Sequence, residues 1–145
     1  MNMLNGKLGY TLMEMMIVVV VIAILAAAGI PYYKDHIERQ KAALGVTNIR
    51  MIADSVERYM ALRNDTIPES FTLLDAEIDR SKLTHHNTAY NDGSFTYTIV
   101  ANSRTPHVLG VRNTGEYSLI FSLGDNAELT CSSTDPDICS NKLGL

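Results

Sequence analysis

The stretch GKLGYTLMEMMIVVVVIAILAAAGIP, residues 6–31, decides the fold of this chain. It contains one acidic residue, Glu14, and no polar side chain from Met15 to Ile30. A carboxylate beside hydrocarbon costs roughly 2.5–3.5 kcal/mol on insertion scales, so it is expected to have a partner or a function. The purpose of Glu14 therefore separates the possible interpretations of this segment.

Two interpretations leave Glu14 without a purpose. A secretory signal peptide would use Lys7 as its positive end and Ala26–Ala28 as its cleavage site, and the mature chain would begin at Gly29. An ordinary signal anchor would use residues 10–30, which as a helix extend about 31 Å and can cross a bilayer. In both cases the negative charge of Glu14 lies at the start of the apolar segment and has no function there.

A third interpretation gives Glu14 a partner. If the chain is cut between Gly9 and Tyr10, a new α-amino group appears one helical turn before Glu14. This amine is positively charged near neutral pH, and in apolar surroundings it can pair with Glu14 of a neighbouring subunit. Such a pair sets the register between helices more than it adds stability.

The sequence G-Y-T-L-M-E before an unbroken apolar run resembles the processing site of type IV pilins and type II secretion pseudopilins. The resemblance implies a leader, residues 1–9, that a prepilin peptidase removes after Gly9 before methylating the new N-terminus at Tyr10. Glu14 is then the fifth residue of the mature chain. Pro31 is the twenty-second, where many pilins also carry proline. Phenylalanine is usual at the first position, so Tyr10 is a departure that keeps an aromatic ring.

The apolar segment, residues 10–31, is expected to anchor the subunit in the membrane and later to form the core of a filament. Lys7 on the cytoplasmic side agrees with the positive-inside rule. Pro31 cannot form the helical hydrogen bond to Ala27, and Gly29 lies close by, so we expect the helix to be deformable here.

Residues 32–63 are predicted to form the amphipathic half of the same helix. Apolar residues recur there at three- and four-residue spacing, namely Ile49, Ile52, Val56 and Tyr59. We expect the helix to continue to about Leu62, where Asn64, Asp65 and Pro68 end it, and Gly45 to bend it.

The rest of the chain predicts a connecting loop and then a sheet. Residues 64–93 form the loop, with a helical turn started by Ser70. Strand-like runs follow at FTYTIVA (95–101), HVLGV (107–111), EYSLIFSL (116–123) and, after a turn at Gly124-Asp125-Asn126, AELTC (127–131). We therefore expect an α+β chain. Its long N-terminal α-helix, with a protruding hydrophobic N-terminal half, packs on a 3–4 stranded antiparallel β-sheet in residues 94–145. The resemblance implies the same architecture, the type IV pilin fold.

Two cysteines, Cys131 and Cys139, lie close to the C-terminus. In a chain with an export-like N-terminus they suggest one disulfide, closing the loop 131–139, with two free thiols as the alternative. Many pilins of diderm bacteria carry such a loop, whereas major pseudopilins commonly bind calcium in this region. Asp135 and Asp137 supply at most two carboxylates, so no DxDxD-like calcium set is present.

No motif for catalysis or cofactor binding is found in the sequence. His85 and His86, with Asp79 upstream, resemble a metal site only superficially, because adjacent histidines on a strand point to different faces. There is no Ser-His-Asp signature, Gly-rich phosphate loop or HExxH. A net charge of −4 gives no support for binding nucleic acid. We expect no enzyme, no cofactor and no metal.

The resemblance implies a structural subunit, the major pilin of a type IV pilus used for adhesion, motility or DNA uptake. Its partners would be other copies in a helical filament, the inner-membrane assembly platform, the prepilin peptidase and minor pilins. The subunit would lie in the bacterial inner membrane before assembly, with its head outside the cytoplasm, and in an extracellular filament afterwards. The alternatives are a pseudopilin or minor pilin and, in a different class, a secreted or membrane-anchored monomeric binding domain.

Overall fold

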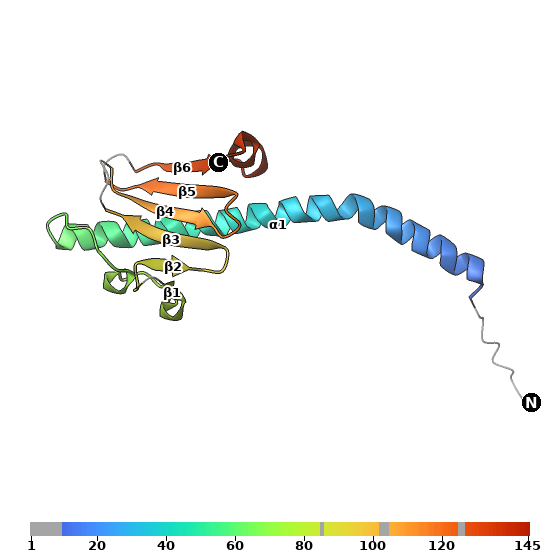
Figure 1. Ribbon diagram of the computed structural model, residues 1–145, viewed down its shortest axis with the longest axis horizontal. Helices are drawn as coiled ribbons and strands as arrows, with labels where there is room; N and C mark the ends of the chain where they lie inside the picture. The colour runs from blue at the N-terminus through green and yellow to red at the C-terminus, as the bar shows by residue number, and fades with distance from the viewer. Residues whose placement is uncertain (1–9, 85, 102–104, 125–126) are drawn as a thin grey trace, which may run out of the picture. The chain divides into compact units, whose positions relative to one another are not determined.

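The computed structural model describes residues 10–84, 86–101, 105–124 and 127–145 (Figure 1). The predicted leader with Gly9, His85, and the predicted turn residues Asp125 and Asn126 lie outside the described residues. The chain divides into two compact units, of which the first ends at Ile37 and the second, called the head below, is Glu38–Leu145.

One helix, α1 (Leu12–Leu62), belongs to both units. The helix ends at Leu62, as predicted. Asn64 and Asp65 take left-handed φ angles of 52° and 57° there, and the Asp65 amide donates a hydrogen bond back to the Met60 carbonyl at 3.0 Å. Gly45, which was predicted to bend the helix, has a packing role in the structure. A Cβ atom there would lie 2.7 Å from Cε2 of Phe95, so this glycine lets the sheet approach α1 closely.

The head contains one six-stranded antiparallel sheet in the order β1-β2-β3-β4-β5-β6, so each strand pairs with its neighbours in the chain. Its strands are β1 (Leu83–Thr84), β2 (Ala89–Asn91), β3 (Phe95–Val100), β4 (His107–Arg112), β5 (Tyr117–Ser122) and β6 (Leu129–Ser133). The α+β class is confirmed, and β3 to β6 lie where four strands were predicted.

The predicted count of three or four strands was too low, and the predicted loop 64–93 is more structured than expected. It contains two 3-10 turns, η1 (Phe71–Leu73) and η2 (Arg80–Lys82), and the short strands β1 and β2. These strands are too short to show alternation, and pairing of β2 with β3 holds them in the sheet. The predicted turn at Ser70 is confirmed, since its side chain accepts a hydrogen bond from the Thr72 amide at 3.2 Å.

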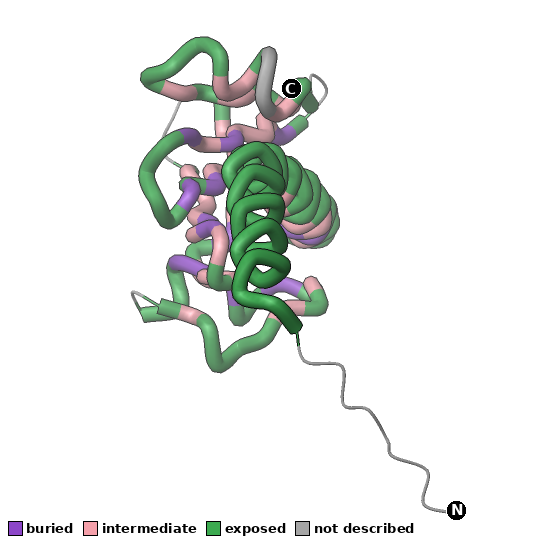
Figure 2. Tube along the Cα trace, turned by 90° about the vertical axis from the view of Figure 1, so that its right-hand side faces the viewer, coloured by how far each residue is buried: buried purple, intermediate pink, exposed green. Residues whose placement is uncertain are grey.

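The core lies between the sheet and the head part of α1 (Figure 2). Alternate side chains of β3, β4 and β5 point inward, and the fully buried ones are Phe95, Tyr97, Val108 and Leu119. They pack with α1 residues that recur at helical spacing, namely Ile49, Ile52, Ala53 and Val56. The predicted core face of the helix is thereby confirmed for three of its four residues, while Tyr59 is only partly buried.

A disulfide joins Cys131 on β6 to Cys139 in the C-terminal turn η3 (Ile138–Lys142). This confirms the predicted pair. The segment after it folds back on itself, since the amides of Leu143 and Leu145 donate to the carbonyls of Ile138 at 3.0 Å and Cys139 at 2.8 Å. Cys131, Ile138 and Leu143 pack against the core, so the loop covers part of the interior as well as facing solvent.

Candidate assembly surface

The helix α1 begins with a capping box formed by Thr11 and Glu14. The Glu14 amide donates to Thr11 Oγ1 at 3.2 Å, and the Thr11 amide and hydroxyl both donate to Glu14 Oε2 at 3.4 Å. This reciprocal pattern satisfies amide groups that have no partner within the helix. The spacing T-x-x-E in the sequence is the signal for it, and the sequence-based prediction of the helix start missed it.

The capping box holds the Glu14 carboxylate next to the peptide that follows Tyr10. Tyr10 itself precedes the helix and is 76% exposed. The described chain thus brings the predicted register residue, Glu14, close to the predicted new N-terminus. From the described residues the Glu14 carboxylate receives two long hydrogen bonds, both from Thr11 at 3.4 Å, so a charged donor can bind it more strongly.

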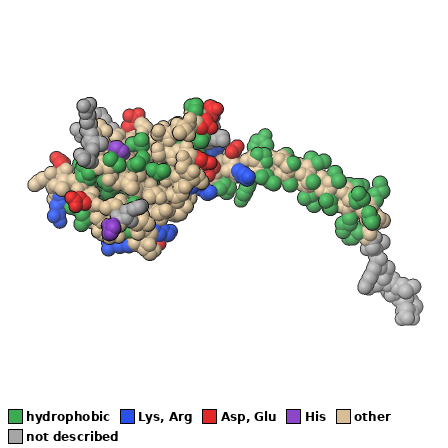
Figure 3. Space-filling model, in the orientation of Figure 1, with side chains coloured by type: hydrophobic (Ala, Val, Ile, Leu, Met, Phe, Trp, Pro, Cys, Tyr) green, Lys and Arg blue, Asp and Glu red, His purple; other side chains and the backbone are tan. Residues whose placement is uncertain are grey.

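The first unit presents an apolar surface along α1 from Leu12 to Ile30 (Figure 3). Large hydrophobic side chains from Leu12 to Ile30 are about half to four-fifths exposed, for example Val18 at 48% and Leu12 at 79%. Among the described residues, α1 is the one helix long and apolar enough to cross a membrane. Isolated in water such a surface is unfavourable, so it requires lipid or other apolar helices as its surroundings.

The residues predicted to deform the helix lie inside α1. Pro31 is within the helix, which continues to Leu62, and a Cβ atom added at Gly29 would meet nothing within 4 Å. Pro31 has no amide hydrogen to donate to Ala27, so one helical hydrogen bond is missing there. The Tyr32 and Tyr33 side chains that follow are exposed, as expected for residues at the edge of an apolar segment.

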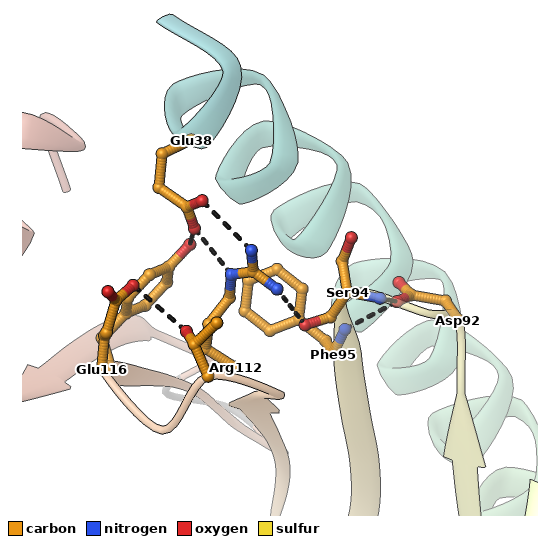
Figure 4. Close-up of polar contacts among 8 residues, drawn as sticks. Glu38, Asp92, Ser94, Phe95, Arg112 and Glu116 are labelled. Carbon is orange, nitrogen blue, oxygen red and sulfur yellow. Dashed lines mark hydrogen bonds and ion pairs between the residues drawn. The ribbon is translucent and has the colours of Figure 1, made fainter. Parts of the chain in front are cut away.

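Within the head, the sheet is fixed to α1 by an ion pair that sequence reasoning missed (Figure 4). Arg112, at the end of β4, is 5% exposed and donates from Nε to Glu38 Oε1 at 2.6 Å and from Nη2 to Oε2 at 3.1 Å. Its Nη1 donates to the Ser94 carbonyl at 2.6 Å, and the Tyr117 hydroxyl donates to Glu38 at 3.2 Å. The guanidinium also lies over the Phe95 ring, 5.6 Å from its centroid. The hydrogen bonds from Arg112 hold the pKa of Glu38 below its usual value.

A second carboxylate, Asp92, fixes the turn between β2 and β3. Its Oδ1 accepts the amides of Ser94 and Phe95, both at 2.7 Å (Figure 4). Its Oδ2 accepts the Tyr97 hydroxyl at 2.7 Å and the Asn48 side chain of α1 at 2.8 Å. Burial together with this carboxylate raises the pKa of Tyr97 well above its usual value.

The acidic residues considered for metal binding have structural roles. The Asp79 carboxylate caps η2 by accepting the Ser81 amide at 3.0 Å, and Asp135 Oδ1 accepts the Asp137 amide at 3.0 Å. In the part of the chain that the structure describes, which leaves out His85, no three His, Cys, Asp or Glu side chains form a group that could hold a metal ion.

Comparison with known proteins gives matches to part of the chain. The prokaryotic N-terminal methylation motif matches residues 4–30. The type IV major fimbrial protein FimA of Dichelobacter nodosus is 59% identical over 39 residues, 27% of this chain and 24% of that protein. A fimbrial protein of Pseudomonas aeruginosa is 34% identical over 76 residues, 52% of this chain and 49% of that protein. The matches thus span about half or less of these relatives. No solved structure matches the chain.

The structure defines an α+β class of protein, in which a long N-terminal helix with an exposed apolar first part packs its later part on an antiparallel sheet. Together with the methylation motif and the fimbrial relatives, this structure indicates a type IV pilin. Pilins are structural proteins, and an apolar helix of this kind fits membrane anchoring followed by incorporation into an extracellular pilus.

Proposed function

We propose that this chain is the major pilin of a type IV pilus, the repeating subunit of a helical filament used for adhesion, motility or DNA uptake. The observation that carries the proposal is the exposed apolar surface of residues 12–30 with Glu14 at its start, inside the matched methylation motif. Similarity to major fimbrial proteins and the disulfide-closed C-terminus support a main subunit over a pseudopilin.

In this proposal a prepilin peptidase removes residues 1–9 by cutting between Gly9 and Tyr10, and it methylates the Tyr10 amine. Residues 10–31 then form the membrane anchor and filament core, and residues 32–63 the amphipathic half of the helix. Residues 64–93 connect the helix to residues 94–145, which form the β-sheet part of the head with the C-terminal disulfide loop 131–139. Before assembly the subunit lies in the inner membrane with its head outside the cytoplasm. The inner-membrane platform assembles it with other copies and minor pilins.

Glu14 aligns each incoming subunit. Its carboxylate already lies at the helix start, held by Thr11 at 3.4 Å. Exchange of this neutral donor for the Tyr10 ammonium of a neighbour adds the attraction of two opposite charges to the hydrogen bond. Gly29 and Pro31 allow the helix to deform as copies pack together, because one backbone hydrogen bond is already absent there.

Mass spectrometry of filaments sheared from cells tests the processing step. We expect a mature chain that begins with methylated Tyr10 and contains the Cys131–Cys139 disulfide. A chain beginning at Gly29 would contradict the proposal, because cleavage after Ala26–Ala28 removes the assembly helix. Finding this subunit only in trace amounts beside another pilin would favour the minor-pilin alternative.

A substitution tests the role of Glu14. We expect Glu14→Ala to leave the subunit in the membrane but to abolish or strongly reduce surface filaments. Asp35→Ala, an exposed carboxylate in the same unit, is the matched control and should assemble normally. Normal filaments from Glu14→Ala would show that Glu14 does not set the register.

A further inference from the structure

The sheet of the head ends at two edges that differ in length and in protection. One edge is β1, which has two residues, and Lys82 directly precedes it. The other edge is β6, which has five residues, Leu-Thr-Cys-Ser-Ser, without a charged residue or a proline. The register of β6 with β5 continues without a bulge. Short length, lysine, proline and bulges keep an edge strand from pairing with another chain, so β1 is protected and β6 is not.

The hydrogen bonds of the sheet show which backbone groups of β6 face outward. The Ser122 amide donates to the Glu128 carbonyl at 3.0 Å, and bonded pairs alternate with non-bonded pairs along an antiparallel ladder. In β6 the residues that bond to β5 are therefore Thr130 and Ser132. The three residues whose backbone N–H and C=O groups point away from β5 are Leu129, Cys131 and Ser133.

These outward backbone groups of β6 are open to a further strand. Among the described residues, no hydrogen-bond partner is found for them. Leu143 and Leu145 line a groove with Ala42 and Val46 of α1, so the C-terminal tail lies on the helix side of the sheet. Figure 1 shows β6 at the margin of the sheet, with the C-terminal turn beyond one end of the strand. Three donors and three acceptors are therefore available along an edge about 17 Å long.

Acidic residues flank this edge in the chain. Glu128 directly precedes β6, and Asp135 and Asp137 lie in the turn after it, all three exposed. Residues 113–145 carry five carboxylate side chains and one lysine, so they account for the whole net charge of −4. Two copies paired through β6 would bring these like charges together, whereas a cationic segment would meet opposite charge at both of its ends.

We infer that β6 binds an extended, cationic segment of a partner protein, which adds a further strand to the sheet. Backbone hydrogen bonds to the outward groups supply the affinity, and side chains select the segment. The Leu129 and Cys131 side chains pack against the core, whereas those of Thr130 and Ser132 are exposed. The segment is therefore expected to alternate apolar and hydroxyl side chains and to carry lysine or arginine at both ends.

Binding of a synthetic peptide to the full chain in uncharged detergent tests the inference. The probe is dye-labelled Lys-Val-Thr-Val-Thr-Val-Lys, followed by fluorescence anisotropy, and Glu-Val-Thr-Val-Thr-Val-Glu is the matched control peptide. We expect the lysine peptide to bind at least tenfold more tightly than the glutamate peptide, and added salt to weaken its binding. In hydrogen exchange followed by NMR, the bound peptide should protect the Leu129, Cys131 and Ser133 amides. The Thr130 and Ser132 amides already bond to β5 and should change little.

Two substitutions at one position test the edge itself. Ser133→Pro removes an outward N–H donor and leaves the bonds to β5 in place, so the lysine peptide should bind at least fivefold more weakly. Ser133→Ala loses the same hydroxyl but keeps the N–H donor, and it should bind the peptide as the parent chain does. If circular dichroism shows that Ser133→Pro is unfolded, Glu128→Lys replaces it, because Glu128 is exposed at the start of β6.

Three results would overturn the inference. The first is a lysine peptide that does not bind at millimolar concentration, and the second is binding without new protection of the outward amides. The third is protection of those amides that rises with protein concentration in the absence of peptide, which would identify a second copy as the occupant of the edge. These measurements depend neither on cleavage at Tyr10 nor on filaments. Their failure is therefore distinguishable from failure of the proposed pilus function, which the mass of the mature chain tests.

Discussion

Arg112 and Glu38 are 74 residues apart in sequence, yet the Arg112 guanidinium donates two hydrogen bonds to the Glu38 carboxylate, at 2.6 and 3.1 Å. The pair lies where the head begins on α1, and it joins the end of β4 to the helix. Arg112 also donates to the Ser94 carbonyl just before β3, and the Tyr117 hydroxyl of β5 donates to Glu38. The Glu38 side chain of α1 is thus connected to β4, β5 and the turn before β3.

We expect Arg112→Met to lower the free energy of unfolding of the head by about 2–4 kcal/mol, because it leaves the partly buried Glu38 carboxylate and the Ser94 carbonyl without their donor. Urea denaturation of the full chain in detergent measures the change. Arg58→Met is the matched control, because Arg58 forms an exposed pair with Asp75 and its loss should cost much less than the loss of Arg112. Equal effects of the two substitutions would contradict the role given to Arg112.

The stability of the head should fall in acid. Hydrogen bonds from Arg58 and Ser55 lower the pKa of Asp75 to about 2, and those from Arg112 lower the pKa of Glu38. A carboxyl whose pKa is lower in the folded state stabilises the fold above its unfolded pKa, and this stabilisation is lost as pH falls through the folded pKa. Urea midpoints should therefore drop between about pH 4 and pH 2. The double variant Glu38→Gln/Asp75→Asn should be less stable at neutral pH and less sensitive to acid, and an unchanged acid dependence would refute this assignment.

Gly45→Ala should destabilise the head by about 1–2 kcal/mol, although alanine is the better helix former by roughly 1 kcal/mol. The added Cβ would lie 2.7 Å from Phe95, whose ring is fully buried between Tyr97 and Tyr117 and cannot move easily. Thermal unfolding followed by circular dichroism measures the effect. Gly29→Ala, where a Cβ meets nothing within 4 Å, is the control and should not destabilise the chain.

Reduction of the Cys131–Cys139 disulfide should cost about 2–3 kcal/mol of head stability on the chain-entropy estimate for a loop of this size. It should also speed hydrogen exchange at the Leu143 and Leu145 amides, which follow the closed loop and donate to the Ile138 and Cys139 carbonyls at its end. Exchange mass spectrometry with and without reductant measures both effects. The variant Cys131→Ser/Cys139→Ser should not respond to reductant, and protection of the C-terminal amides in that variant would show that the disulfide is not what orders the tail.

The helix and the four longer strands were predictable because their signals are local. The apolar run, the three- and four-residue spacing up to Val56 and the strand alternation each follow from neighbouring residues. The short strands β1 and β2 were missed because three or fewer residues cannot show a period, and their stability comes from pairing with β3.

The Arg112–Glu38 pair could not be derived from spacing, but one signal for it was present. Val108, Gly110 and Arg112 share one face of β4, and the other two positions belong to the interior. A charged residue at an inward position requires a buried partner. The sequence alone could not identify this partner, because several carboxylates along the helix were available.

The order of the strands has a consequence for how the head forms. Since β1 to β6 pair in chain order, no strand has to wait for a distant segment, and most contacts within the sheet join residues close in sequence. Such local topology favours fast folding. The sheet can therefore grow strand by strand on α1, and the Cys131–Cys139 disulfide ties the final strand, β6, to the C-terminal turn.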